Sequence, residues 1–330
     1  MRSSARTRRS RTTSWCSRAT GARPTPDRSP AKRYCLCWNA GSSTASRRRG
    51  ASVPRFVRIR VGHSPDPDDA FMFWALATER IETRGHEFEQ VLADIETLNQ
   101  WARSARLEVT ALSLAAYPFV QQDYALLPHG ASIGAGYGPI VVACRSLDRE
   151  ELAKLEIVVP GAMTTSFLAL RLVLGDFRFR ELPFDQIPEE VSSGGADAGL
   201  LIHEGQLTFE DHGLVKVLDL GEWWLLETGL PLPLGVNVAR RDLGAEPLSQ
   251  VSDVLREAIQ CGLDNRAEAL EYALQFGRGI DAAVADRFVA MYVNELTQDY
   301  GDEGRKAVTE LLRRGEELGA FPDAVKIDFI

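Results

Sequence analysis

The sequence has no long hydrophobic run and few of the motifs that hold metals or cofactors. No stretch of its 330 residues approaches the ~20 apolar residues that a helix needs to cross a bilayer. Neither a glycine-rich dinucleotide fingerprint nor a P-loop with its lysine is present. Among five cysteines, Cys35 and Cys37 form a CxC pair, but no second pair completes a zinc site. We therefore expect no metal, no cofactor and no membrane-spanning segment.

Basic residues are scarce after residue 55. Residues 56–330 hold 24 Arg and Lys against 45 Asp and Glu, a net charge of −21. Nucleic acids and anionic membrane surfaces are bound through clustered cations, so this part of the chain is not expected to bind either. The first 55 residues are the opposite, because they hold fourteen basic residues and a single acid, Asp27.

Residues 1–55 are rich in Arg, Ser and Thr and nearly free of aliphatic side chains, so we expect a disordered segment. They lack the apolar core of roughly 7–15 residues that a secretory signal needs. A transit peptide and a basic nucleic-acid tail both fit the composition, but we favour a start codon assigned too early. Cys144 and Cys261 are interpreted as reduced core residues, which favours a cytoplasmic protein.

From Phe56 onward, short strands alternate with helices, which indicates an α/β fold. We expect a first set of strand–helix units to end with a strand at 140–144 and the chain to cross near 145–152 into a second set. Residues 231–240, which contain two prolines and then an extended stretch, are expected to return the chain to the first set. Helices are expected to follow near 248–260, 265–276, 281–296 and 302–318. Residues 56–144 and 236–330 would then form lobe 1 and residues 145–235 lobe 2, with a ligand cleft between them.

A histidine and several hydroxyl groups fall where expected strands end. His203 follows the buried strand 198–202, and ligands of open α/β sheets collect at such ends. A histidine there can exchange a proton near neutral pH, although an isolated one is more often a surface residue. Ser64 and Ser113 stand at strand-to-helix junctions, where a serine is either an anion contact or a helix cap.

Three consecutive hydroxyls, Thr164, Thr165 and Ser166, open the helix that follows the strand 155–160. Three are more than capping requires, so the turn predicts a cradle for a carboxylate or phosphate. The glycine-rich segment 130–138 is interpreted as a loop with positive φ angles and close backbone approach. The Trp223–Trp224 pair is either core or a substrate platform.

Several motifs together resemble the menaquinone-biosynthesis family related to type 2 periplasmic binding proteins, from about Val57 to the C-terminus. They are Ser64-Pro-Asp-Pro-Asp-Asp-Ala-Phe71, Asp94-Ile-Glu-Thr-Leu-Asn99, Leu112-Ser-Leu-Ala-Ala-Tyr117, Pro160-Gly161 with Thr164-Thr165, Ile202-His-Glu204, and Asp219-Leu-Gly-Glu-Trp-Trp224 through Gly235.

The resemblance implies a two-lobed fold of the type 2 periplasmic-binding-protein kind and a lyase without a cofactor. The implied reaction is the base-initiated fragmentation of cyclic dehypoxanthinylfutalosine to 1,4-dihydroxy-6-naphthoate, with His203 as general base and Thr164, Thr165 and Ser166 holding the substrate carboxylate. Ser64 and Ser113 complete the expected site. Two alternatives remain, a chorismate dehydratase-type activity and a binding protein for a small carboxylate. In each, the partner is a small-molecule carboxylate.

The first motif departs from the family's usual Ser-Pro-Cys-Pro-Asn-Asp-Thr-Phe. This chain has Asp66 for the cysteine, Asp68 for the asparagine and Ala70 for the threonine. The extra carboxylates either face the ligand, where they would repel an anion and change the substrate, or point into solvent.

Overall fold

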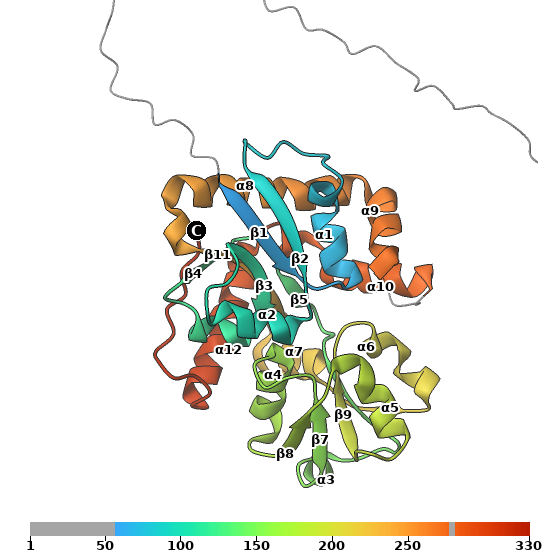
Figure 1. Ribbon diagram of the computed structural model, residues 1–330. Coiled ribbons are helices and arrows are strands. Elements are labelled where there is room, and N and C mark those ends of the chain that lie inside the picture. Colours follow the sequence, from blue (N-terminus) through green and yellow to red (C-terminus); the bar gives the residue numbers. More distant parts are fainter. Residues whose placement is uncertain (1–56, 277–280) are drawn as a thin grey trace, which may run out of the picture. The chain divides into compact units, whose positions relative to one another are not determined.

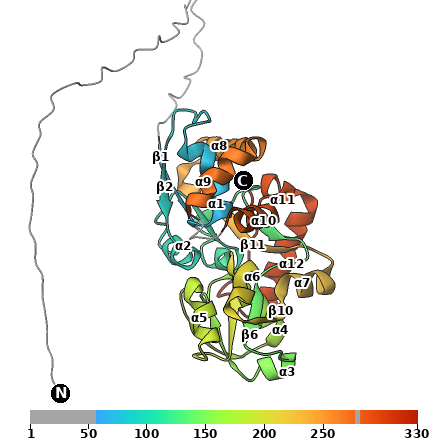
Figure 2. The same ribbon diagram turned by 90° about the vertical axis from the view of Figure 1, so that its right-hand side faces the viewer.

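The computed structural model describes residues 57–276 and 281–330, which fold around two mixed β-sheets (Figures 1 and 2). The expectations for residues 1–55 lie outside the described residues. In Figure 1 the blue and cyan elements and the orange helices surround the first sheet, and the green and yellow elements surround the second. The expected pair of α/β units is confirmed. No helix in the described part of the chain is long and apolar enough to cross a membrane.

The first sheet has the strand order β2 (Glu87–Leu92), β1 (Arg58–His63), β3 (Val109–Ser113), β11 (Leu232–Arg240) and β4 (Tyr124–Leu126). β1 runs parallel to β2 and β3, whereas β11 is antiparallel to β3 and β4. β5 (Ser132–Gly134), which we did not predict, also pairs with β11. The parallel strands β1 and β3 therefore end at one edge of the sheet, with Ser64 and Ser113 there.

Helices of the first sheet come from both ends of the described chain. They are α1 (Pro67–Ala77), α2 (Ile95–Ala102), the 3-10 helix η1 (Leu114–Phe119), α8 (Ala245–Asp264), α9 (Arg266–Ala273), α10 (Ala282–Tyr292), α11 (Glu295–Gln298) and α12 (Gly301–Glu317), with the short 3-10 turns η4 (Arg241–Leu243) and η5 (Leu274–Phe276). Pro67 at the first position suits the start of α1, because its missing N–H would have no helical partner there. α1 packs against α8, α9 and α10, so it is buried from Pro67 to Ala75.

The second sheet has the strand order β10 (Val215–Asp219), β6 (Ile140–Ala143), β9 (Ala198–Leu201), β7 (Glu156–Val159) and β8 (Arg178–Glu181). β7 is parallel to β8 and β9, and β6 is antiparallel to β9 and β10. Its helices are α3 (Arg149–Leu152), α4 (Thr165–Leu174), η2 (Phe184–Gln186), α5 (Ile187–Ser192), α6 (Gly205–Thr208), η3 (Phe209–His212) and α7 (Leu220–Thr228). His203 follows β9, and the three hydroxyls follow β7.

Two expected boundaries were wrong. We assigned 140–144 to lobe 1, but β6 lies between β9 and β10 in the second sheet, so the chain crosses before Ile140. An apolar run of four residues fits either sheet, and only its distant partners decide which. The return also comes earlier than 236, because β11 is part of the first sheet from Leu232. Cys144 lies just past β6 and is exposed, contrary to the core assignment, while Cys261 is partly buried.

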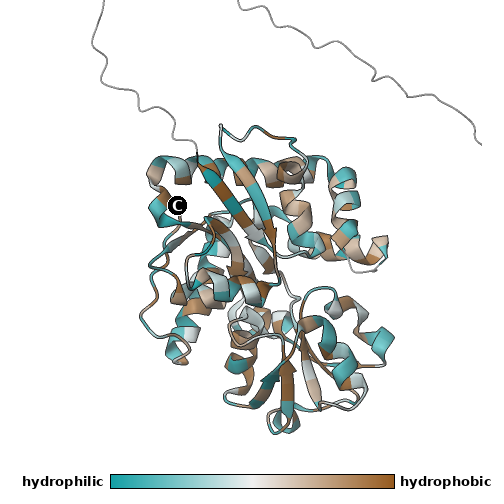
Figure 3. Cartoon of the chain, in the orientation of Figure 1, coloured by the Kyte–Doolittle hydropathy of each residue, from teal (hydrophilic) through white to brown (hydrophobic). Residues whose placement is uncertain are grey.

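The largest cluster of buried side chains joins the two sheets. It includes Tyr117 of η1 and Leu311 of α12 from the first group, with Leu168 of α4 and Trp224 of α7 from the second. Trp224 is fully buried and donates from Nε1 to the carbonyl of Pro231, so this tryptophan is a core residue. In Figure 3, β7 and β9 of the second sheet carry mostly hydrophobic colours. A packed apolar core therefore joins the elements of the two sheets.

The glycine-rich segment carries the chain from the first sheet to the second. Gly136 has φ +82°, and a Cβ on Gly138 would lie 2.9 Å from the amide nitrogen of Gly221 in α7. The expectation of positive φ and close backbone approach is confirmed at these positions.

Candidate active site

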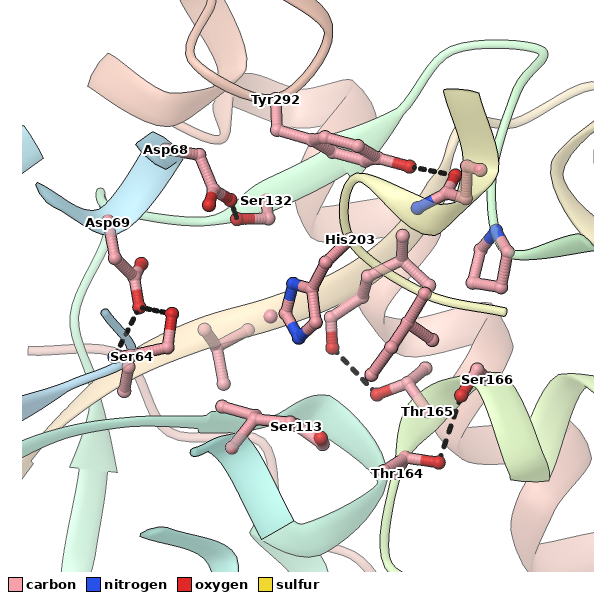
Figure 4. Close-up of a pocket in the computed structure, with 18 of the residues that line it drawn as sticks. Ser64, Asp68, Asp69, Ser113, Ser132, Thr164, Thr165, Ser166, His203 and Tyr292 are labelled. Atoms are coloured by element: carbon pink, nitrogen blue, oxygen red, sulfur yellow. Dashed lines mark hydrogen bonds between the residues drawn. The ribbon is translucent and has the colours of Figure 1, made fainter. Parts of the chain in front are cut away.

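A cavity of about 670 Å³, open solvent at its mouth included, is lined by residues of both sheets (Figure 4). This volume lies in the range of small-molecule sites, roughly 300–1,000 Å³. All the residues predicted for the site line it, namely Ser64, Ser113, Thr164, Thr165, Ser166 and His203. The structure therefore brings together side chains that the sequence spreads over 140 positions, from 64 to 203.

Ser64 is held by a buried carboxylate. Its amide and its hydroxyl both donate to Oδ2 of Asp69, each at 2.8 Å. Burial raises the pKa of Asp69, and the hydrogen bonds from Ser64 oppose that rise. Because the Ser64 hydrogen points to Asp69, its oxygen reaches the cavity mainly as an acceptor.

Ser113 is held by Asn99 of α2. Its amide donates to Asn99 Oδ1 at 2.8 Å, and its hydroxyl oxygen accepts from Asn99 Nδ2 at 3.1 Å. The second bond uses a lone pair of Ser113, so the hydroxyl hydrogen is still available to a ligand. Ser113 can thus donate into the cavity, which Ser64 does not do in this arrangement.

The hydroxyls of Thr164 and Thr165 are used within the protein. Thr164 Oγ1 donates to the carbonyl of Gly161 at 2.8 Å and accepts from the amide of Phe167, which makes it the N-cap of α4. Thr165 Oγ1 donates to the carbonyl of Leu234 at 2.6 Å and accepts from the amide of Ala115. Ser166 Oγ lies 2.9 Å from Thr164 Oγ1. The amides of Thr165 and Ser166, in the first turn of α4, have no carbonyl to bond within the helix.

His203 adopts a left-handed backbone, φ +52°, just beyond β9. Its ring stacks edge-on to Phe184, with the ring centroids 4.8 Å apart. Nδ1 lies 3.2 Å from Oδ2 of Asp66, and Nε2 is buried without a hydrogen-bond partner. The expected strand-end histidine is therefore a partly buried residue of the cavity wall, with a side chain that is 16% exposed.

The three aspartates of the first motif are all buried, so they do not point into solvent. Asp66, Asp68 and Asp69 have exposed fractions of 1%, 6% and 8%. Asp68 Oδ2 accepts from Ser132 at 3.3 Å, while its Oδ1 is buried without a partner. Burial, together with the charges of Asp69 and Asp66, raises the pKa of Asp68 well above its usual value. The protonated form of Asp68, in which one oxygen can donate a hydrogen bond, is therefore favoured.

Three further cavity residues were not predicted. Ser132 is on the unpredicted strand β5, and Gln206 of α6 accepts a hydrogen bond of 2.8 Å from the hydroxyl of Tyr292 of α10. Burial raises the pKa of this tyrosine, which keeps it a hydrogen-bond donor. No local signal marks Gln206 or Tyr292, because their pairing depends on how α6 meets α10. Within residues 57–276 and 281–330, no three His, Cys, Asp or Glu side chains are grouped as a metal site.

Comparison with known proteins finds a family model and two relatives that agree with one another. The family model described as menaquinone biosynthesis matches residues 59–317. A 1,4-dihydroxy-6-naphthoate synthase of Thermus thermophilus is 41% identical over 261 residues, which cover 79% of this chain and 95% of that protein. A protein of the same name from Streptomyces coelicolor is 37% identical over 270 residues, which cover 80% and 95%.

Solved structures give the same fold. A crystal structure of an Archaeoglobus fulgidus protein matches with a TM-score of 0.77 and 45% identity, over 80% of this chain and 98% of that one. The alkanesulfonate-binding protein SsuA of Xanthomonas axonopodis matches with a TM-score of 0.63 but 14% identity, over 82% and 96%. The periplasmic sulphonate-binding protein of Escherichia coli matches with a TM-score of 0.59 and 13% identity, over 82% and 90%. At such identities the likeness concerns the fold alone, and that fold is the periplasmic-binding-protein fold.

Proposed function

Because the chain belongs to the menaquinone biosynthesis family, we propose that it converts cyclic dehypoxanthinylfutalosine to 1,4-dihydroxy-6-naphthoate, with His203 as general base. The chain is an enzyme of menaquinone biosynthesis that acts on a small metabolite. The observation that carries the proposed role of His203 is the position of its Nε2, which is buried in the cavity without a partner. A cytoplasmic location belongs to the same proposal, in keeping with the free thiols of Cys144 and Cys261.

The substrate carboxylate is proposed to bind at the start of α4. The amides of Thr165 and Ser166 have no helical acceptor, and the helix dipole adds partial positive charge there. Thr164 and Thr165 would contribute by fixing this turn, since their hydroxyls bond to the protein. Ser113 remains as a hydroxyl donor to the ligand, whereas the hydroxyl hydrogen of Ser166 is used on Thr164 Oγ1, so Ser166 contributes its amide.

The rest of the cavity has apolar walls, which suit the hydrocarbon part of the proposed substrate. The apolar side chains that line it come from elements of both sheets and include Ile95, Ala111, Pro139, Ile202, Leu234, Val236 and Phe288. Such walls exclude water, which strengthens the hydrogen bonds and charge interactions made inside the cavity. In the proposed step, His203 Nε2 removes a proton from the bound substrate, and the sugar-derived piece leaves as the naphthoate ring forms.

The test is turnover of cyclic dehypoxanthinylfutalosine by the full chain, with naphthoate measured by chromatography. His203→Ala should lower kcat by about 10²–10⁴-fold, the contribution of a well-placed base, while calorimetry still detects substrate binding. His212→Ala is the matched control, because His212 is an exposed histidine of the same sheet's helices and lies outside the cavity.

Each outcome has one meaning. Turnover retained in His203→Ala removes His203 as the base. Substrate that binds to the wild-type chain but is never converted identifies a binding protein. Consumption of chorismate in place of the futalosine derivative would assign the sibling dehydratase activity.

A further inference from the structure

We propose that Asp66 is a positioning residue that fixes the tautomer and the orientation of the His203 imidazole. This inference rests on the proposed function, in which His203 is the base. Asp66 Oδ2 lies 3.2 Å from His203 Nδ1, and the Asp66 side chain is 1% exposed. The pair joins the two sheets, because Asp66 precedes α1 of the first and His203 follows β9 of the second.

The side chain of Asp66 is not used in the way its place in the helix suggests. Asp66 is the N-cap residue of α1, where an aspartate normally accepts from an amide of the first turn, yet it makes no such capping bond. Its amide approaches Ser64 Oγ at 3.4 Å, while its carboxylate is turned to His203. A residue type suited to stabilising the helix thus faces the other sheet.

The contact decides which imidazole nitrogen can accept a proton. When Nδ1–H donates to Asp66, the lone pair of the neutral ring lies on Nε2, the nitrogen buried in the cavity without a partner. The opposite tautomer would place a hydrogen on Nε2, and that nitrogen could then not act as a base. Asp66 would also stabilise the imidazolium that forms when Nε2 takes the substrate proton.

The ring is restrained from two further directions. The left-handed backbone of His203 sets where its side chain begins, and Phe184 packs edge-on at a centroid distance of 4.8 Å. Neither contact distinguishes Nδ1 from Nε2, because both act through shape. Asp66 supplies the polar restraint. The other ionisable groups that line the same cavity are Asp68 and Asp69 of α1 and Tyr292 of α10, and Glu204 follows the histidine in the chain.

The kinetic test compares Asp66→Asn and Asp66→Ala with the wild-type full chain on cyclic dehypoxanthinylfutalosine. Both should lower kcat by about 10²-fold or more and leave KM within about threefold, because the lost contact matters chiefly in the transition state. Asp66→Glu, which keeps the carboxylate, should recover part of the loss. Asp211→Asn is the control, an exposed aspartate changed in the same way.

A second readout does not need turnover. Chains labelled with ¹⁵N in their five histidines give the protonated nitrogen of each ring by NMR, and the signals of His203 are those lost in His203→Gln. At alkaline pH the neutral His203 of the wild type should carry its hydrogen on Nδ1. In Asp66→Ala the hydrogen should move, at least in part, to Nε2.

The two proposals fail in different ways. A wild-type chain that is folded but inactive removes the proposed reaction, while the NMR result still decides the tautomer. If the wild type is active and Asp66→Asn and Asp66→Ala keep its kcat and the same tautomer, the positioning role is overturned. Loss of kcat with an unchanged tautomer and a lowered melting temperature would overturn it as well, because Asp66 would then act only through folding.

Discussion

Asn99 binds Ser113 with both ends of its carboxamide, so one buried side chain fixes both the backbone and the hydroxyl of a cavity residue. The two distances are 2.8 Å to the Ser113 amide and 3.1 Å to its Oγ, and Asn99 is fully buried. Because both residues lie on elements of the first sheet, this pair sets the geometry of the cavity wall before any ligand enters.

Replacing Asn99 with Ala should lower the free energy of unfolding by about 2–3 kcal/mol, since it leaves the buried Ser113 amide unpaired and creates a small void. KM should rise, because Ser113 loses its fixed position. Denaturant unfolding and steady-state kinetics measure the two effects. The exposed neighbour Gln100→Ala should change stability by less than about 0.5 kcal/mol. Equal effects in both variants would contradict the assigned role of Asn99.

Gly221→Ala should be strongly destabilising, because an added Cβ would lie 2.0 Å from the backbone carbonyl of Tyr137. Backbone cannot move aside as a side-chain end can, so we expect a loss of about 3 kcal/mol or more. Gly205→Ala is the matched control, since its Cβ would meet Leu201 at an ordinary 3.7 Å. Thermal unfolding of the two variants tests this, and similar melting temperatures would refute the close approach at Gly221.

The pH dependence of stability should contain a contribution from His129. Burial, helped by the charge of Arg256, lowers the pKa of this histidine to about 4. Between about pH 6.5 and 4 the unfolded chain binds a proton that the folded chain does not, so stability falls as the pH falls. The full contribution is about 3 kcal/mol. Urea unfolding of wild type and His129→Gln across this pH range should show that the variant loses less stability as the pH falls. Parallel curves would exclude the contribution.

Asp68→Asn should stabilise the protein increasingly as the pH rises. The folded-state pKa of Asp68 is raised, so its favourable contribution is complete below the unfolded value near 3.8 and is lost as the pH increases through the folded value. An asparagine has the shape of the protonated acid and never ionises. The melting temperature of the variant relative to wild type should therefore be higher at pH 8 than at pH 5, by about 2–4 °C for each kcal/mol gained. The reverse order would show that folding lowers the pKa of Asp68 and does not raise it.

The sequence was sufficient to predict residues whose position follows from a strand end. Ser64 follows β1 and Ser113 ends β3, and the carboxyl ends of parallel strands meet at one edge of a sheet, so the meeting of these two serines could be foreseen. His203 was found in the same way, at the end of a strand of the other sheet. Ser132 could not be foreseen, because a three-residue strand carries no periodic signal. Asp66 was noticed as a departure from a motif, but its contact with His203 depends on how the two sheets approach each other. The assignment of β6 to lobe 1 was wrong for the same reason, because the sheet that a short apolar strand joins is decided by partners distant in sequence.

The left-handed backbone of His203 places a conformational cost at the position of the proposed base. A non-glycine residue in this conformation costs about 1–2 kcal/mol, whereas glycine adopts it without strain and asparagine adopts it readily. A library of variants selected for heat resistance alone is therefore expected to enrich glycine or asparagine at position 203 and to lose the proposed base. Gains in thermostability would therefore have to be engineered at positions outside the cavity.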